Sequence, residues 1–128
     1  MDHKGIIVRP SPYTVKETVD RLQEFLLQHG ATIYARIDQQ DELGKSGQTI
    51  APLEFLLFGN PKAGGPVMIE NRLTALDLPL KIIAWEDGQQ KVWVAYNDSS
   101  YIRERFDLSE TISLPLNLDP LVLKVLNG

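Results

Sequence analysis

Residues 80–96 read LKIIAWEDGQQKVWVAY, and this stretch decides the fold. Two runs rich in β-branched and aromatic residues, 80–85 and 91–96, flank the turn-forming pair Asp87-Gly88. Such a pattern is typical of a β-hairpin. Within each run, successive side chains point to opposite faces of a sheet. The stretch therefore predicts two antiparallel neighbours in a sheet with two distinct faces.

The alternation assigns each side chain of the hairpin to a face. The first face, which should meet the helices, carries Leu80, Ile82, Ala84, Val92, Val94 and Tyr96. The second face carries Lys81, Ile83, Trp85, Lys91, Trp93 and Ala95. In the expected register Ile83 lies opposite or near Trp93, so the apolar side chains of the second face form a patch. Monomers rarely leave such a patch in water, which predicts a homodimer that buries Trp93; the alternative is cover by residues 38–52 or by the C-terminal helix.

The rest of the chain supplies further strands and helices. A helix begins at Thr14, which has capping-box spacing to Glu17, and ends before Gly30. A second helix should begin at Pro66 and a third, over about 119–127, at Asp119. The second should bury Ile69, Leu73 and Leu76. The expected strands are 5–9, stopped by Pro10, then 31–37, 53–58, 80–85 and 91–96.

Three segments have a less regular pattern. Residues 38–52 are polar and contain glycine, which predicts a mobile loop or a cover over a site, with a short helical turn at its start. Residues 98–108 are expected to be a short helix or irregular, and 114–118 fit no single pattern.

These elements predict one α+β domain over residues 1–128. A β-α-β unit precedes the hairpin and a terminal helix, which favours a mainly antiparallel sheet with helices packed on one face. A doubly wound parallel sheet is the alternative. A chain of 128 residues is near the commonest size for one domain.

Composition excludes several classes of function. The formal charge is −4 and the 13 Lys and Arg are scattered, so no nucleic acid is expected as a partner. The longest apolar runs, such as 121–126, are too short to span a membrane, which needs about 20 residues. With no cysteine and two histidines, the sequence offers no disulfide, thiolate nucleophile or His-rich metal site. The first residues show no leader pattern, so a cytoplasmic location is expected.

Five short motifs carry a resemblance to a known family. They are Ile37-Asp38, residues 54–62 (EFLLFGNPK), Pro66-Val67-Met68, Leu78-Pro79-Leu80 and Tyr96-Asn97-Asp98. Their order and spacing resemble the bacterial family catalogued as domain of unknown function 302, over about residues 5–105. The resemblance implies a TATA-binding-protein-like fold, β-α-β4-α, without implying DNA binding.

The chain departs from this family at one position. Members typically carry Ile-Asp-His where this chain has Ile37-Asp38-Gln39. An amide cannot take up a proton near pH 7 as an imidazole does, so histidine-dependent chemistry of relatives is not expected here.

The loop from Gly59 to Pro66 is the first candidate site. It follows a strand and contains three glycines and Lys62, but no Lys-Ser or Lys-Thr follows its last glycine, so it is not a P-loop. Lys62 and free helix N–H groups could hold an anion. Alternatively, Asn60 and Pro61 only shape the exit from the strand.

Carboxylates are the second candidate. Asp38 and Glu54 lie near the ends of neighbouring expected segments and could bind a cation or act as a pair with separated pKa values. The first hypothesis is a non-enzymatic domain that binds a small ligand or ion near the turn 58–62. Its expected site residues are Asp38, Glu54, Phe58, Asn60, Lys62 and Tyr96. The alternative is a metal-assisted or carboxylate-dependent hydrolase or isomerase that uses Asp38 and Glu54; the sequence leaves the cofactor unknown.

Overall fold

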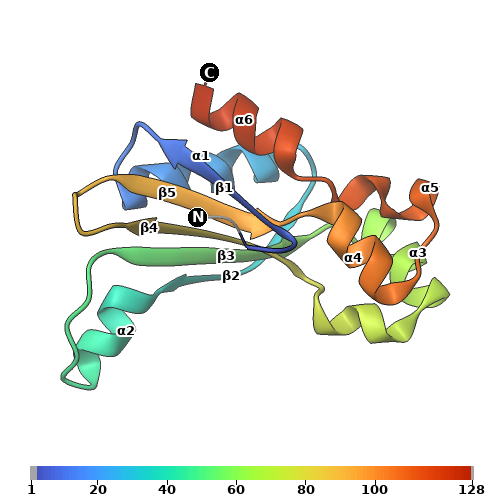
Figure 1. Ribbon diagram of the computed structural model, residues 1–128, viewed down its shortest axis with the longest axis horizontal. Helices are drawn as coiled ribbons and strands as arrows, with labels where there is room; N and C mark the ends of the chain where they lie inside the picture. Colours follow the sequence, from blue (N-terminus) through green and yellow to red (C-terminus); the bar gives the residue numbers. More distant parts are fainter. Residues whose placement is uncertain (1–2, 128) are drawn as a thin grey trace.

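The computed structural model describes residues 3–127 (Figure 1). Its strands are β1 (Ile6–Ser11), β2 (Thr32–Asp38), β3 (Leu53–Gly59), β4 (Leu80–Glu86) and β5 (Val92–Asn97). Its α-helices are α1 (Val15–Gln28), α2 (Gln39–Lys45), α3 (Pro61–Glu70), α4 (Ser99–Phe106), α5 (Glu110–Ser113) and α6 (Asp119–Asn127). Two 3-10 helices, η1 (Arg72–Leu76) and η2 (Leu114–Leu116), complete the order. Within this part of the chain, no helix has the length and apolar character needed to cross a membrane.

The five strands form one sheet in the order β1-β5-β4-β3-β2, and every neighbouring pair is antiparallel. This confirms the α+β prediction and not the doubly wound alternative. β1 and β2, which α1 connects, lie at opposite edges, and the three later strands lie between them.

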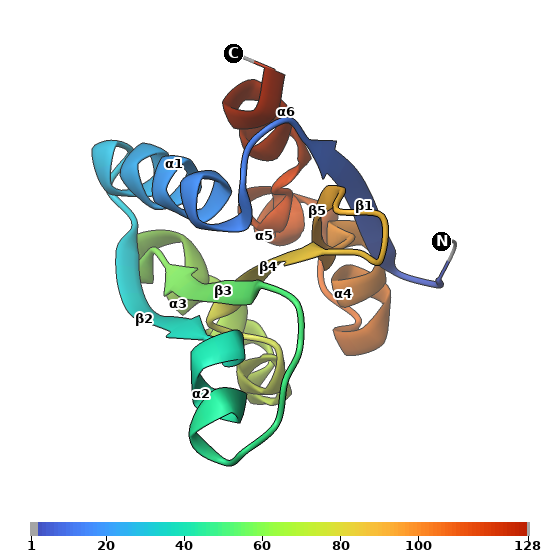
Figure 2. The ribbon, with the colours of Figure 1, turned by 90° about the vertical axis from the view of Figure 1, so that its left-hand side faces the viewer.

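One face of the sheet carries helices α1 and α6 (Figure 2). The buried cluster between them contains the apolar stripe of α1 and the hairpin face that was expected to meet the helices. The stripe is Val15, Val19, Leu22 and Leu26, and the hairpin residues are Ile82, Ala84, Val92, Val94 and Tyr96. Thr14 caps α1 by accepting from the Glu17 amide at 3.1 Å, as the capping-box spacing predicts.

The opposite face of the sheet has no helix over its middle (Figures 1 and 2). Trp85 pairs with Trp93 across the hairpin, and Ile83 pairs with Ala95, diagonal to Trp93. The apolar residues of this face, here called the open face, are Ile6, Val8, Pro10, Ala35, Ile37, Leu53, Phe55, Leu57, Ile83, Trp85, Trp93 and Ala95. None belongs to either buried cluster of the described residues. Because α6 packs on the other face, the C-terminal helix does not cover Trp93.

The first strand is longer than predicted. β1 runs through Pro10 to Ser11, and Pro10 pairs with Trp93. Proline is tolerated there because β1 is an edge strand, so the missing N–H breaks no ladder.

The prediction for the second helix is wrong in its start and its face. α3 begins at Pro61, not Pro66, because the Asn60 side chain accepts from the Lys62 amide and caps it. It ends at Glu70, and η1 follows as a separate element. The residues expected to be inside are instead exposed: Ile69 by 85%, Leu73 by 65% and Leu76 by 72%. Val67 is the residue that α3 buries.

A second buried cluster lies at one end of the sheet. α3, α4 and η2 contribute to it, and its members are Val67, Ile102, Phe106, Leu108 and Leu116. Leu80 packs against both clusters. The two buried clusters therefore meet at the start of β4, and a cavity lies at this junction.

Candidate functional site

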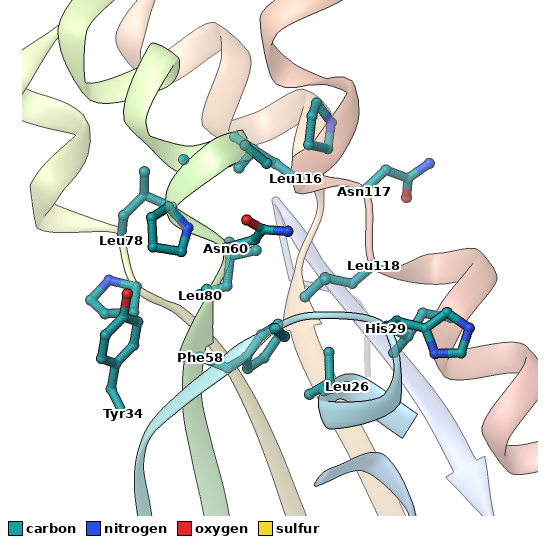
Figure 3. A pocket seen from close by; sticks show the side chains of 18 of the residues that line it. Leu26, His29, Tyr34, Phe58, Asn60, Leu78, Leu80, Leu116, Asn117 and Leu118 are labelled. Carbon is teal, nitrogen blue, oxygen red and sulfur yellow. The ribbon is translucent and has the colours of Figure 1, made fainter. Parts of the chain in front are cut away.

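A cavity of about 350 Å³ lies where the two buried clusters meet (Figure 3). We call it the junction cavity. Its wall combines the end of α1, the paired ends of β2 and β3, the first turn of α3 and the segment from η2 to α6. The lining residues are Leu26, His29, Ala31, Tyr34, Phe58, Gly59, Asn60, Pro61, Ala63, Gly64, Met68, Leu78, Pro79, Leu80, Pro115, Leu116, Asn117, Leu118 and Leu121.

The lining is mainly apolar. Over the described residues 3–127 it includes no Asp, Glu, Lys or Arg. Its polar side chains are His29, Tyr34, Asn60 and Asn117. Such a surface favours an apolar ligand oriented by a few hydrogen bonds.

Asn60 has its amide orientation fixed by the chain. Its Oδ1 accepts from the Lys62 amide at 3.0 Å, and only the oxygen of an amide side chain can accept. Nδ2 is therefore the opposite atom, free to donate. Figure 3 shows the Asn60 amide among Phe58, Leu116 and Leu118, with its nitrogen directed into the space between them.

Tyr34 reaches the cavity because of a bulge in β2. The register between β2 and β3 shifts between Ile33 and Ala35, and a bulge of this kind redirects a side chain. A Cβ on Gly59 would lie 3.4 Å from the Tyr34 ring, so the glycine leaves room for that ring. Tyr34 is 53% exposed and stands at the mouth of the cavity.

His29 borders the cavity from the end of α1. Its Nδ1 lies 2.8 Å from the Phe25 carbonyl oxygen, to which it donates, and its ring stacks on Phe25 with centroids 4.0 Å apart. The ring is thus held at the C-terminal cap of α1. Nε2 remains to accept a hydrogen bond when the ring is neutral.

Asp38 and Glu54 are neighbours, but not at the cavity. They pair directly across β2 and β3, at the end opposite to the Thr32–Gly59 pair. Their carboxylates have different partners: Asp38 accepts from the Asp41 amide at 2.9 Å and caps α2, while the buried Glu54 accepts from Arg36 Nε at 3.1 Å. Arg36 also binds Asp20 at 2.6 Å.

The metal-binding prospects of the two acids follow from this arrangement. Among residues 3–127 no group of three or more His, Asp or Glu side chains could hold a metal ion. Glu54, 8% exposed, has its charge balanced by the guanidinium of Arg36.

Lys62 and Tyr96 also lie outside the lining. Lys62 is exposed in the first turn of α3. Tyr96 is buried in the core, as expected, but its hydroxyl donates to Asp119 and does not reach a ligand. Burial and this bond raise the pKa of Tyr96 well above its ordinary value. Asp119 also accepts from Arg9 at 2.9 Å, so the three side chains attach α6 to β1 and β5.

Two of the six expected site residues, Phe58 and Asn60, therefore line the cavity. Sequence reasoning missed the other residues that line the cavity, chiefly Leu26, Tyr34, Met68, Asn117 and Leu118. A signal existed only for segment 114–118, where three leucines alternate with Pro115 and Asn117 and fit neither a helix nor a strand clearly.

Comparisons with known proteins agree with this fold. The family model of "Domain of unknown function DUF302" matches residues 7–116. The crystal structure of an uncharacterized conserved DUF302 protein from Bacillus stearothermophilus superposes with a TM-score of 0.80 at 17% identity, covering 98% of both chains. The chain belongs to the DUF302 family.

Curated relatives are longer than this chain. "Fluoride-specific ion channel FluC 1" of Brucella suis biovar 1 (strain 1330) is 34% identical over 104 residues, which are 81% of this chain and 41% of that protein. The protein of the same name from Brucella abortus biovar 1 (strain 9-941) is also 34% identical over 104 residues, which are 38% of its length. The chain thus spans about two fifths of the curated relatives that it matches.

Proposed function

We propose that this DUF302 chain is a binding domain that holds a small molecule in the junction cavity. The observation that carries the proposal is the cavity itself: a concave, mainly apolar space of about 350 Å³ with a few polar groups. Small-molecule pockets have this character and volumes of about 300–1,000 Å³. The turn 58–62, selected from the sequence, forms one wall through Phe58, Asn60 and Pro61.

The relatives are compatible with a binding role. In the Brucella proteins, the segment similar to this chain is joined to a longer remainder. A binding module in such a position can couple ligand occupancy to its neighbour. The hydrolase or isomerase alternative has less support, because Glu54 is engaged by Arg36 and Asp38 by the α2 amide.

Gly64 offers a direct test of the cavity. It lines the cavity within α3, and an added Cβ would meet no atom within 4 Å. Gly64→Ala should raise stability by about 0.5–1 kcal/mol, since glycine disfavours helix interiors. Gly64→Leu should fill part of the cavity and weaken binding of an apolar fluorescent dye at least tenfold, measured by titration.

The control is a leucine at another open helical glycine. A Cβ added to Gly44 in α2 would also meet no atom within 4 Å, and Gly44 lies outside the junction cavity. Gly44→Leu should therefore leave dye affinity unchanged. Native mass spectrometry of the purified wild-type chain would show any retained ligand. Equal dye affinity in the wild type and Gly64→Leu would place binding elsewhere and end the proposal.

We also propose that the chain forms a homodimer through its open face. The support is the half-buried Trp85–Trp93 pair near the hairpin turn, with the half-buried Ile83 beside it and no helix over the middle of this face; Phe55 is only 8% exposed in the single chain. Lys81 is the charged residue of β4 on this face, and its Nζ lies 4.2 Å from the Phe55 ring centre. The Asp87 carboxylate also accepts from Trp93 Nε1 at 2.8 Å at the margin of this face. A mainly apolar surface with charges of both signs at its margin can pair with a copy of itself across a two-fold axis.

Sedimentation tests the dimer. The wild type should sediment at twice the chain mass at micromolar concentration, whereas Ile83→Glu, which places a charge in the open face, should sediment as a monomer. Leu73→Glu, an equal charge change at an exposed residue off the sheet, should remain dimeric. A wild type that stays monomeric as concentration rises would remove the interface.

A further inference from the structure

The chemistry of the junction cavity defines the class of molecule that it accepts. We propose that the ligand is a small, uncharged, mainly apolar carbonyl compound whose oxygen accepts from Asn60 Nδ2. This inference rests on the proposed function, because it takes the junction cavity as the binding site.

Among the described residues, the lining has no Asp, Glu, Lys or Arg to pair with a charged ligand. The lining residues, all within the described chain, carry no acidic or basic side chain other than the imidazole of His29. A carboxylate or ammonium moved into apolar surroundings loses its hydration and is costly without an opposite charge. Lys62 and Glu54, the charged residues favoured from the sequence, lie outside this wall.

Asn60 supplies one directed donor. Because its Oδ1 is held by the Lys62 amide, the side chain cannot flip to present an acceptor without losing the cap of α3. Nδ2 has no partner among the hydrogen bonds of the described residues, and it points among Phe58, Leu116 and Leu118. A carbonyl oxygen, an acceptor that cannot donate, matches this fixed group.

The other polar residues of the lining are Tyr34, which is 53% exposed at the mouth, and His29 and Asn117, which each have one polar atom engaged. His29 has Nδ1 engaged by Phe25, and Asn117 uses its Oδ1 to accept from the Asp119 amide at 3.2 Å. Figure 3 shows both toward the α1 and α6 side, while Asn60 lies among the apolar side chains. Asn60 itself is exposed, so its Nδ2 borders the apolar wall from the open side of the cavity, and the ligand's apolar body would contact Leu26, Phe58 and Leu118.

Size narrows the class further. A volume of about 350 Å³ is near the lower limit for small-molecule sites, which are about 300–1,000 Å³. It suits a medium-chain or cyclic ketone, ester or lactone better than a whole membrane lipid.

The test compares three probes of equal carbon number: nonanone, nonanoate and nonylamine. Each displaces an apolar fluorescent dye from the full chain, with Gly64→Leu run in parallel to locate the dye. Nonanone should bind at least tenfold more tightly than either charged probe, and Gly64→Leu should weaken it at least tenfold.

Asn60→Asp isolates the donor. Aspartate also caps helices, so the melting temperature should change little, while the donor is replaced by a charged acceptor. Nonanone affinity should fall about tenfold and nonylamine affinity should rise. Asn60→Ala is less suitable, because losing the cap costs about 1 kcal/mol by itself.

The outcomes separate the two proposals. If nonanoate or nonylamine binds the wild type as tightly as nonanone, or if Asn60→Asp leaves nonanone affinity unchanged, the carbonyl class is wrong and cavity binding stands. If Gly64→Leu binds the dye and all three probes as tightly as the wild type does, the cavity is not the site and both proposals fail.

Discussion

Gly5→Ala should lower the melting temperature by roughly 10 °C. The free energy of unfolding should fall by about 3 kcal/mol, and each kcal/mol lowers the melting temperature by a few °C. Gly5 has φ +76°, where an L-residue costs about 1–2 kcal/mol. Its added Cβ would also lie 2.4 Å from Tyr101 Cγ and 2.9 Å from Tyr101 Cβ. These atoms are at the root of the side chain, so rotation of the ring alone cannot relieve the clash.

Two variants divide this effect into its causes. Gly47 has φ +81° and open space around a Cβ, so Gly47→Ala should cost only the conformational part, about 1–2 kcal/mol. The double variant Gly5→Ala/Tyr101→Ala should lose less stability than the sum of the losses in the two single variants, because the effects of changes at residues in contact are not additive. Chemical denaturation measures Gly5→Ala, Gly47→Ala, Tyr101→Ala and the double variant. Equal losses in Gly5→Ala and Gly47→Ala would show that the contact with Tyr101 costs nothing.

Asp119→Ala should cost about 2–3 kcal/mol, because hydrogen bonds to a charged group contribute about 1.5–3 kcal/mol. Asp119 accepts from both Arg9 nitrogens and from the Tyr96 hydroxyl. The change leaves the buried hydroxyl and the part-buried guanidinium without their acceptor. Lys16→Ala, which removes an exposed ion pair with Asp20, is the control and should cost less than about 1 kcal/mol.

The same carboxylate makes stability depend on acid. Burial raises the pKa of Asp119, but the hydrogen bonds from Tyr96 and Arg9 lower it by more. The pKa of Asp119 is therefore lower in the folded chain than in the unfolded chain. The stabilisation that this carboxylate contributes is complete above the unfolded pKa of about 3.9, and it is lost as the pH falls through the folded pKa. Asp20, bound by Arg36, and Asp87, bound by the Trp93 indole, have pKa values lowered in the same direction.

Denaturation curves between about pH 6 and 2 test this sign. The wild type should lose stability below about pH 4, and Asp119→Asn should lose less over the same interval. A wild type and variant with parallel curves would mean that Asp119 does not contribute to the acid response.

Local patterns predicted the sheet because its strands and turns have signals within a few residues. The alternation of 80–96 placed each hairpin side chain on its observed face, and Thr14 was found as the cap of α1. The adjacency of Asp38 and Glu54 also followed from neighbouring strand ends. The partner of Glu54 did not, because Arg36 was counted only as one of several scattered cations.

The failures involve choices that local sequence leaves open. Pro61 and Pro66 are both acceptable first residues of a helix, and Asn60 decides between them by capping at Pro61. Burial of Val67 in the second buried cluster then sets the inner face of α3, which periodicity alone assigned to Ile69. The cavity brings together the end of α1, the turn after β3 and the segment after η2, and such long-range contacts have no local pattern.

The placement of β1 at the edge beside β5 also orders events in time. Among the described strands, residues 6–11 pair with residues 92–97, so β1 leaves the ribosome before its partner strand has been made. Loop closure over such a separation is slow compared with closing the β4–β5 hairpin. Until β5 emerges, β1 and the apolar stripe of α1 lack their partners, and this interval is when the nascent chain is most exposed to misassociation.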